Sequence, residues 1–170
     1  GNEKHGTSKN TSVIINDSLY LDGVGDYVQM AADFPSGTED VSMSAWFKAD
    51  STTNHMGIIS KGWHFGRMWL VVNQTTGVIR ENTFFGGEED NETGRWSLDF
   101  WMNTETSVKD DFKWHHIAST ADRDGLQKVY FDGVLLNSTD ISTASEVEWT
   151  DIESFFVGTM GWPGNKRFFN

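Results

Sequence analysis

The side chains best suited to contact a ligand are those of the tryptophans, of which the chain contains 8. Several occur in runs where apolar and polar residues alternate, and each shares its phase with a hydrogen-bonding side chain. These pairs are Trp69 with Asn73, Trp101 with Asp99, and Trp46 with Lys48. Because alternate residues of a strand point to opposite faces, the pattern predicts a sheet face that carries indole rings and polar groups together. Such a face suits a sugar, whose C–H face stacks on the ring while amides and carboxylates bind its hydroxyl groups.

Two aromatic loop segments extend this expectation to the rim of the sheet. One contains Trp63 and His64, and the other contains Trp162 and Asn165. The expected ligand-binding residues are therefore Trp63, His64, Trp69, Asn73, Asp99, Trp101, Trp162 and Asn165. The competing interpretation is that the tryptophans belong to an ordinary hydrophobic core, because large aromatic side chains are usually well buried.

Acidic turns supply candidate sites for calcium, which takes roughly six to eight oxygen ligands from carboxylates and carbonyls. One turn contains Asp22 and Asp26, and another contains Asp122 and Asp124. These four aspartates are the expected metal ligands, with Ca²⁺ in a structural role. The acidic loop of residues 88–92 is a further oxygen cluster. The alternative is that these loops are simply solvated, as most acidic loops are.

The adjacent His115 and His116 do not form a metal site by themselves. Neighbouring residues of a strand point to opposite faces, so the two rings cannot chelate one ion without a bulge. We expect one of them to lie in the core and the other to face a groove. His55 and His64 lie in loop-like stretches that nothing fixes in place.

Residues 113–137 predict the antiparallel meander that must position these side chains. Two runs rich in Val, Ile and aromatic residues flank the polar turn 121–125, and Asp132-Gly133 then separates two apolar runs. Asp-Gly is typical of a type I′ hairpin turn, because both of its central residues need positive φ. Residues 41–49 alternate cleanly, so one face of this strand is expected to pack on an opposite sheet.

The order Trp114-His115-His116-Ile117-Ala118, a polar turn, then Val129-Tyr130-Phe131-Asp132-Gly133 resembles the hallmark of the concanavalin A-like, laminin-G-like jelly rolls. Residues 19–28 are similar to the opening strand pair of that family, and residues 41–48 and 58–62 to its next two strands. The resemblance runs from about Leu19 to Gly161. It implies an all-β fold, a two-sheet antiparallel jelly-roll sandwich.

The chain departs from the family at its C-terminal end. Members usually continue past the equivalent of residues 168–170 into a strand that returns beside the first strand, and this sequence lacks that strand. The family often holds a structural calcium near the same strand. Three explanations stay open: the sequence is a fragment, residues 12–16 cover the gap, or a neighbouring subunit inserts a strand. The last predicts self-association through an open sheet edge.

The sequence indicates no catalytic site. Jelly-roll glycoside hydrolases that this fold resembles carry Glu-x-Asp-x-x-Glu on one strand, which points carboxylates into a cleft at the separation needed for an acid and a nucleophile. The nearest match, residues 146–153, has other spacing and precedes the last strand in a loop-like stretch. No nucleophile elbow is present. We expect a protein that is not an enzyme.

Length and composition indicate one domain over residues 13–170, preceded by a flexible polar tail over residues 1–12. The net charge is −12, with 13 Lys and Arg scattered among 25 acidic residues, which argues against nucleic acid as a partner. Anionic membrane surfaces are disfavoured for the same reason. No apolar run approaches the roughly 20 residues that cross a bilayer, so membrane insertion is not expected.

Several features favour an extracellular or cell-surface location. Asn-x-Ser/Thr sequons begin at Asn10, Asn16, Asn73, Asn91 and Asn137. The absence of cysteine argues against a small disulfide-stabilised animal ectodomain and favours a bacterial or archaeal surface protein. The sequence as a whole predicts a non-catalytic binding or adhesion module for carbohydrate or a cell-surface glycan. The alternative is a structural subunit of a surface layer or filament, and a glycoside hydrolase is a distant third.

Overall fold

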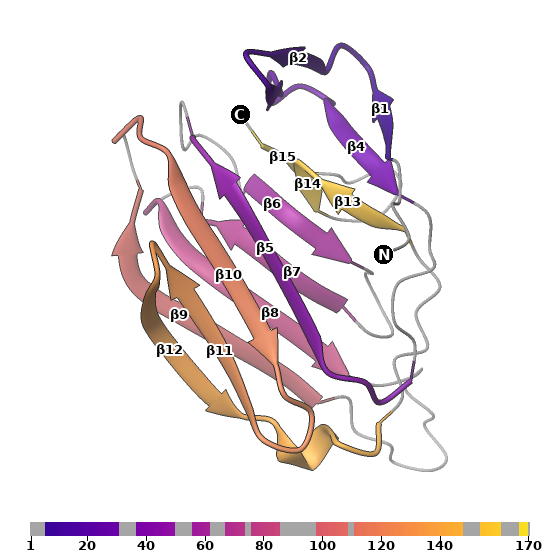
Figure 1. Cartoon of the computed structure of the whole chain (residues 1–170), viewed down its shortest axis with the longest axis vertical. Coiled ribbons are helices and arrows are strands. Elements are labelled where there is room, and N and C mark those ends of the chain that lie inside the picture. Colours follow the sequence, from indigo (N-terminus) through magenta and orange to yellow (C-terminus); the bar gives the residue numbers. More distant parts are fainter. Residues whose placement is uncertain are drawn as a thin grey trace.

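Two antiparallel β-sheets packed face to face form the body of the molecule (Figure 1). The structure, a computed structural model, describes residues 6–30, 37–49, 56–61, 67–73, 76–85, 98–108, 111–147, 154–160 and 167–169. The regular structure of these residues consists of strands β1 to β15 and one turn of 3-10 helix, η1, at Ser142–Ala144. None of the described helices is long and apolar enough to span a membrane. The predicted jelly-roll sandwich is confirmed.

The larger sheet has seven strands in the order β1-β4-β13-β6-β7-β8-β9. Their bounds are Thr7–Lys9, Tyr27–Met30, Phe155–Val157, Met56–Lys61, Arg67–Val72, Val78–Phe85 and Leu98–Ser107, in that order. The smaller sheet has the order β12-β11-β10-β5. Its strands are Val134–Asp140, Leu126–Phe131, His115–Ala121 and Val41–Phe47. Two pairs stand apart: β2 (Val13–Ile15) with β3 (Ser18–Tyr20), and β14 (Thr159–Met160) with β15 (Arg167–Phe168).

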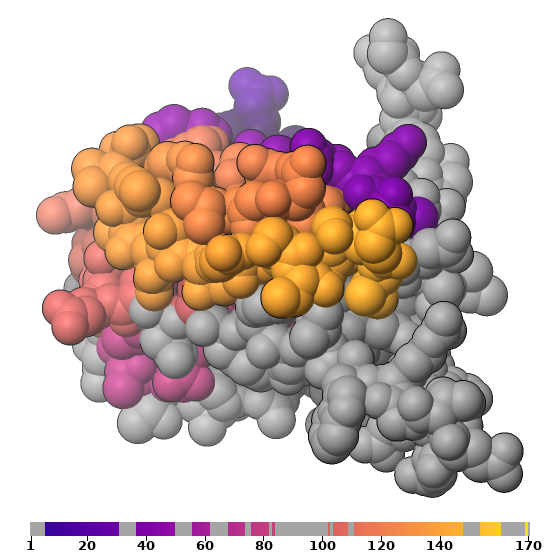
Figure 2. Space-filling model, turned by 90° about the horizontal axis from the view of Figure 1, so that it is seen from below, coloured from indigo at the N-terminus to yellow at the C-terminus, as the bar shows by residue number. Residues whose placement is uncertain are grey.

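Strand β5 shows the alternation that its sequence predicts. Val41, Met43 and Phe47 are buried and Ala45 packs partly buried against the core, whereas Ser42, Ser44 and Trp46 are exposed, Trp46 to 67%. β10 pairs with β5 along its whole length, from His115 opposite Phe47 to Ala121 opposite Val41. In Figure 2 the residues of this sheet form one continuous surface, with those of β10 to η1 in orange and yellow and those around β5 in purple beside them.

The predicted meander of β10, β11 and β12 is also confirmed. Asp132 and Gly133 have φ of 49° and 81°, so both central residues of the turn adopt the positive φ that a type I′ turn requires. β12 continues to Asp140, three residues beyond the end of the predicted meander at residue 137. A register shift after Val129 lets the later residues of β12 keep pairing with β11.

The core lies between the two sheets. Met43, Phe47, Ile117 and Val129 of the smaller sheet belong to the same buried cluster as Ile58, Met68, Leu70, Ile79 and Met102 of the larger one. Polar groups also cross this interface: the Gln127 amide of β11 donates hydrogen bonds to Glu81 and Thr83 of β8, and all three residues are fully buried. The two sheets are therefore joined by hydrogen bonds as well as by apolar contacts.

The N-terminal region differs from expectation in one respect. β1 falls within the stretch predicted to be a polar tail, and it pairs with β4 at the edge of the larger sheet. The tail prediction relied on the absence of apolar periodicity, but an edge strand with exposed faces needs little of it. The β2–β3 hairpin turns at Asn16 and Asp17, whose φ values of 49° and 61° lie in a region that Asn and Asp tolerate well.

Gly57 of β6 allows the close approach of β14. A Cβ atom at this position would lie 2.5 Å from the carbonyl carbon of Thr159 and 2.6 Å from the nitrogen of Met160. Both atoms belong to the backbone, so a rotation of a neighbouring side chain cannot relieve the clash. β14 is further held by the Ser60 hydroxyl, which donates to the carbonyl oxygen of Thr159 at 2.7 Å.

We expect Gly57→Ala to destabilise the fold by about 2 kcal/mol, because the added methyl group must push β14 away from β6. Urea unfolding of the two proteins measures this change. Gly133→Asn is a matched control: it is a glycine at φ 81° with nothing within 4 Å of its Cβ direction, and Asn accepts that conformation. Equal stability of Gly57→Ala and the parent chain would contradict the close approach.

Candidate functional site

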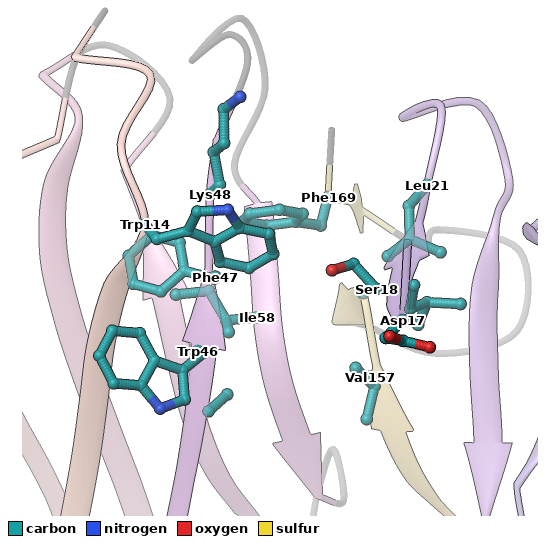
Figure 3. Close-up of a pocket in the computed structure, with 13 residues that line it drawn as sticks. Asp17, Ser18, Leu21, Trp46, Phe47, Lys48, Ile58, Trp114, Val157 and Phe169 are labelled. Atoms are coloured by element: carbon teal, nitrogen blue, oxygen red, sulfur yellow. The ribbon is translucent and has the colours of Figure 1, made fainter. Parts of the chain in front are cut away.

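A groove opens where the smaller sheet ends at β5. We call it the edge groove, and it encloses about 280 Å³ between β5 on one side and the β2–β3 hairpin on the other (Figure 3). β5 is the terminal strand of its sheet among the described residues, so its backbone is paired with β10 on one side only. The groove therefore combines a sheet edge with a cavity.

The floor of the edge groove is apolar and its rim is mixed. The apolar lining residues are Leu19, Leu21, Ala45, Phe47, Ile58, Val157 and Phe169. Gly158, with φ of 83°, completes the lining, and Phe47 and Phe169 meet edge to face with ring centroids 6.0 Å apart. At the rim lie Asp17, Ser18, Trp46, Lys48 and Trp114. Figure 3 shows Trp46 and Phe47 on the β5 side, and Asp17 and Ser18 on the hairpin side.

Two tryptophans at this rim are strongly exposed. Trp46 is 67% exposed and Trp114 is 52% exposed, values that are high for the largest apolar side chain. Trp46 lies opposite His116 in the β5–β10 ladder, with ring centroids 5.2 Å apart. Trp114 lies directly before β10, two residues from His116, and lines the same groove as Trp46. We call Trp46, Trp114 and His116 the aromatic rim.

His115, the residue between Trp114 and His116, turns the other way. Its ring stacks on Phe131 with centroids 4.6 Å apart and an interplanar angle of 27°, and it contacts Phe47 at 6.0 Å. One of the two histidines thus faces the core side and the other the outer face, as their adjacency predicts. Phe47 belongs both to the groove lining and to the contacts of His115.

Each ring nitrogen of His115 lies against a carboxylate. Nδ1 is 2.8 Å from Oδ2 of Asp132, and Nε2 is 2.7 Å from Oδ2 of Asp111. Burial disfavours the charged ring, but the hydrogen bonds to Asp132 and Asp111 outweigh it and raise the pKa of His115 above 6.5. Burial likewise opposes ionisation of Asp132, yet the hydrogen bonds from His115 and the His116 backbone lower its pKa below 3.8. We call this arrangement the His115 clasp.

The predicted residues of the larger sheet lie away from the edge groove. Trp69 is only 4% exposed and packs with Val71 and Met160 on the side of β7 opposite the main core. Asn73 is 8% exposed, and its Oδ1 accepts hydrogen bonds from the backbone and hydroxyl of Thr76, both at 3.2 Å. Burial of Trp69 favours the core interpretation, and Asn73 holds the turn between β7 and β8.

The other predicted ligand residues are placed only in part. Asp99 and Trp101 lie on β9, and the register brings Trp101 opposite Asn82, which is itself opposite Trp69. The backbone positions of Trp69 and Trp101 therefore share one row across the larger sheet. Trp63, His64, Trp162 and Asn165 lie outside the described residues, so their predicted role at a rim remains a prediction.

Asp26, predicted to bind calcium, is 1% exposed and accepts hydrogen bonds at both carboxylate oxygens. The backbone and hydroxyl of Thr11 donate to Oδ1 at 2.8 and 3.0 Å, and the backbone of Asp22 donates to Oδ2 at 3.2 Å. Burial opposes ionisation, but these hydrogen bonds outweigh it and lower the pKa of Asp26 below 3.8. The Asp22 side chain accepts from the backbone of Val24 at 2.7 Å. Asp26 thus ties residues 11 and 22 together.

The second predicted calcium turn contains a pair of interacting carboxyl groups. A side-chain hydrogen bond with Asp124 raises the pKa of Asp122 above 3.8, and the nearby charges of Asp124 and Asp40 act in the same direction. Among the residues that the structure describes, no group of three or more His, Asp or Glu side chains is arranged to hold a metal ion. Calcium also accepts carbonyl oxygens, so its binding at these turns stays a prediction.

Sequence reasoning missed most of the edge groove. Alternation places Trp46 on one face with Lys48, but the expected ligand residues do not include Trp46. Trp114, Asp17, Ser18 and Phe169 carried no pattern that would have grouped them, since they come from segments far apart in the chain. Only the fold of the hairpin and the edge position of β5 bring them together.

Comparison with known families agrees with this fold. The family model of the laminin-G-like members of the concanavalin A-like lectin/glucanases superfamily matches residues 22–170. The chain belongs to this superfamily. No curated protein sequence is significantly similar to the chain.

Several solved structures share the fold. The binding domain of botulinum neurotoxin serotype D superposes with a TM-score of 0.67 at 18% identity, over 99% of this chain and 42% of that one. The serotype D ligand-binding domain in complex with N-acetylneuraminic acid gives 0.65 at 21%, over 98% and 42%. The binding domain of botulinum neurotoxin DC in complex with rat synaptotagmin II gives 0.61 at 11%, over 96% and 40%. This chain thus spans less than half of each neighbour, and the neighbours are binding domains.

We expect Asp26→Asn to lower the thermal midpoint at neutral pH, because the neutral amide replaces a carboxylate that three hydrogen-bond donors favour. The pKa of Asp26 is lower in the folded state, so its contribution is present above pH 3.8 and is lost as the pH falls through the folded-state pKa. Thermal melts from neutral to strongly acidic pH measure this, and the two proteins should converge in acid. A constant difference at all pH values would contradict the role given to the charge.

Proposed function

We propose that this chain is a non-catalytic, extracellular module that binds carbohydrate on cell-surface glycans at the aromatic rim of the edge groove. The observation that carries the proposal is the exposure of Trp46 and Trp114 at the mouth of one groove. Hydrating two large indole surfaces is unfavourable, and contact with a ligand relieves that cost.

The composition of the groove suits a sugar. An indole ring covers the C–H face of a pyranose, while nearby polar groups address its hydroxyls. Asp17, Ser18 and Lys48 are the polar side chains at the rim. The volume of about 280 Å³ lies near the lower end of the range of ligand pockets, which is suited to one or two sugar units rather than to an enclosed polymer.

The comparisons support a binding role over catalysis. The structural neighbours are binding domains, and one of them was determined with N-acetylneuraminic acid. Within the described part of the chain, the most buried carboxylate, Glu81, lies inside the sandwich and accepts hydrogen bonds from Thr83 and Gln127. A carboxylate in that position is not accessible to a polysaccharide. An extracellular location agrees with the sequons and the absence of cysteine.

We expect Trp46→Ala and Trp114→Ala each to weaken glycan binding by at least about tenfold, because aromatic anchors dominate binding energy at such sites. The measurement is binding to a glycan panel that includes lactose, 3′-sialyllactose, and plant and bacterial cell-wall polysaccharides. The panel is run with calcium and again with a chelator, since the sequence predicts a structural calcium. Loss of binding with the chelator would support the prediction that the protein contains calcium.

Leu126→Ala is the matched control for these variants. Leu126 is 41% exposed on the same sheet but pairs with Asp140 at the end opposite the aromatic rim, so its loss should leave binding unchanged. If both tryptophan variants bind as the parent does, the glycan site lies elsewhere, for example at Trp63 or Trp162. A blank panel for the parent chain would contradict carbohydrate binding.

A second candidate function is assembly into a surface layer or filament through β5. The edge position of β5 favours it, because unpaired backbone groups are a template for a strand from another chain. A strand laid along β5 would occupy the edge groove and cover its apolar floor. Assembly and glycan binding would then compete for the same space beside Trp46.

If assembly occurs, sedimentation velocity should show larger species as the concentration rises. Hydrogen exchange of residues 41–47 should slow in parallel, because pairing protects the amides that β10 leaves free. A monomer at millimolar concentration, with unchanged exchange in β5, would exclude this candidate. That outcome would leave the glycan proposal unaffected.

A further inference from the structure

The His115 clasp lies directly behind the aromatic rim. Its ring contacts Phe47, which lines the edge groove, at 6.0 Å, and its sequence neighbours Trp114 and His116 belong to the rim. The side chain of His115 is 12% exposed, so its environment is set mainly by the protein. A change in the hydrogen bonds of this ring therefore acts on residues that border the groove.

The segment held by the clasp is a strained turn. Asp111 begins it, and besides meeting His115 Nε2 it accepts a hydrogen bond from the backbone of Lys113 at 3.2 Å. Phe112 has φ of 53°, an unfavourable value for an aromatic residue, and its side chain is 53% exposed. Trp114 follows this turn directly. The Asp111–His115 contact thus spans the residues that deliver Trp114 to the rim.

Protonation of His115 decides how many carboxylates the ring can bind. The charged imidazolium has two N–H donors and satisfies Asp111 and Asp132 together, whereas the neutral ring keeps one N–H. Asp132 is also held by the backbone of His116, which donates to its Oδ1 at 2.8 Å. Asp132 therefore stays in place when the ring loses its proton, and Asp111 is the partner that is released.

The other groups around the ring do not replace this control. From the turn between β11 and β12 the titratable group facing His115 is Asp132, from the turn before β10 it is Asp111, and His116 is next on β10 itself. β11 and β5 present the uncharged rings of Phe131 and Phe47. Lys48 follows Phe47 on β5 and belongs to the rim of the groove.

We propose that the His115 clasp is a pH-sensitive positioning device for the carbohydrate site: the charged ring holds residues 111–114 so that Trp114 borders the groove, and loss of the proton releases Asp111 and weakens binding. The inference rests on the proposed function for its ligand. The folded-state pKa of His115 is raised, so the clasp is fully formed below pH 6.5 and opens as the pH rises through that higher value. Glycan affinity should therefore fall with increasing pH.

The first experiment needs no glycan. The protein is labelled with 5-fluorotryptophan, the Trp114 resonance is assigned with Trp114→Phe, and this resonance and the His115 ring are followed by NMR from pH 5 to pH 10. The two should titrate with one midpoint above 6.5. Asp111→Asn keeps an acceptor but removes the charge, so it should move both midpoints to lower pH. Glu105→Gln, an exposed change on β9 of the other sheet, should move neither.

The second experiment measures affinity for the best-bound glycan of the panel across the same pH range. The parent chain should lose about fivefold in affinity between pH 6 and pH 9, a modest coupling energy. His115→Gln cannot take up a proton, so its affinity should be independent of pH over this range. If His115 had only a structural role, His115→Gln would instead lower glycan affinity by the same factor, relative to the parent chain, at every pH.

The results separate the two proposals. A Trp114 resonance that ignores the His115 titration, or midpoints that Asp111→Asn leaves unchanged, would overturn the clasp whatever the glycan data show. A blank glycan panel with Trp114 still following His115 would overturn the carbohydrate function, and the positioning of Trp114 by His115 would stand.

Discussion

Pairing of β5 with β10 is the interaction on which the rest of the molecule depends. It runs from Phe47 opposite His115 to Val41 opposite Ala121, and it sets which side chains enter the sandwich. Because side chains alternate with a period of two residues, a slip of one residue would bury Trp46 and expose Phe47. Burial of the inward set between the sheets therefore fixes the register. The same register places Trp46 and His116 opposite each other on the outer face.

The edge position of β5 gives the protein its groove. β10 has a partner on each side, and its inward residues are sealed in the core, whereas β5 borders an apolar floor that reaches solvent. An apolar groove beside a strand with one unpaired edge suits two kinds of occupant, a sugar that stacks on the indoles or a strand that pairs with the backbone. Trp46 and Trp114 favour the first, and the free edge favours the second. Both occupants need the space beside the free edge of β5, so binding of one would exclude the other.

Several buried polar groups act as ties between segments. The backbone of Arg123 donates to Asp40, and its guanidinium donates to the carbonyl oxygens of Ala144 and Val147, so it links the loop before β5 to η1. Burial lowers the pKa of Arg123, yet its donors have acceptors on both segments. Asp26 has the corresponding role near the N-terminus. Asp40 and Asp26 thus each join segments that are distant in the sequence.

Alternation and turn chemistry are local, so the sequence predicted the meander and the faces of β5, while the family resemblance predicted the sandwich. The structure confirms all three. The sequence did not determine exposure. Trp46 and Trp69 both occupy outward phases, but Trp46 is 67% exposed on an edge strand and Trp69 is 4% exposed in the interior of its sheet, packed with Met160. The groove, the aromatic rim and the clasp join residues from distant segments, so only tertiary packing decided them. Periodicity gives the direction of a side chain, whereas exposure depends on what the rest of the chain places over it.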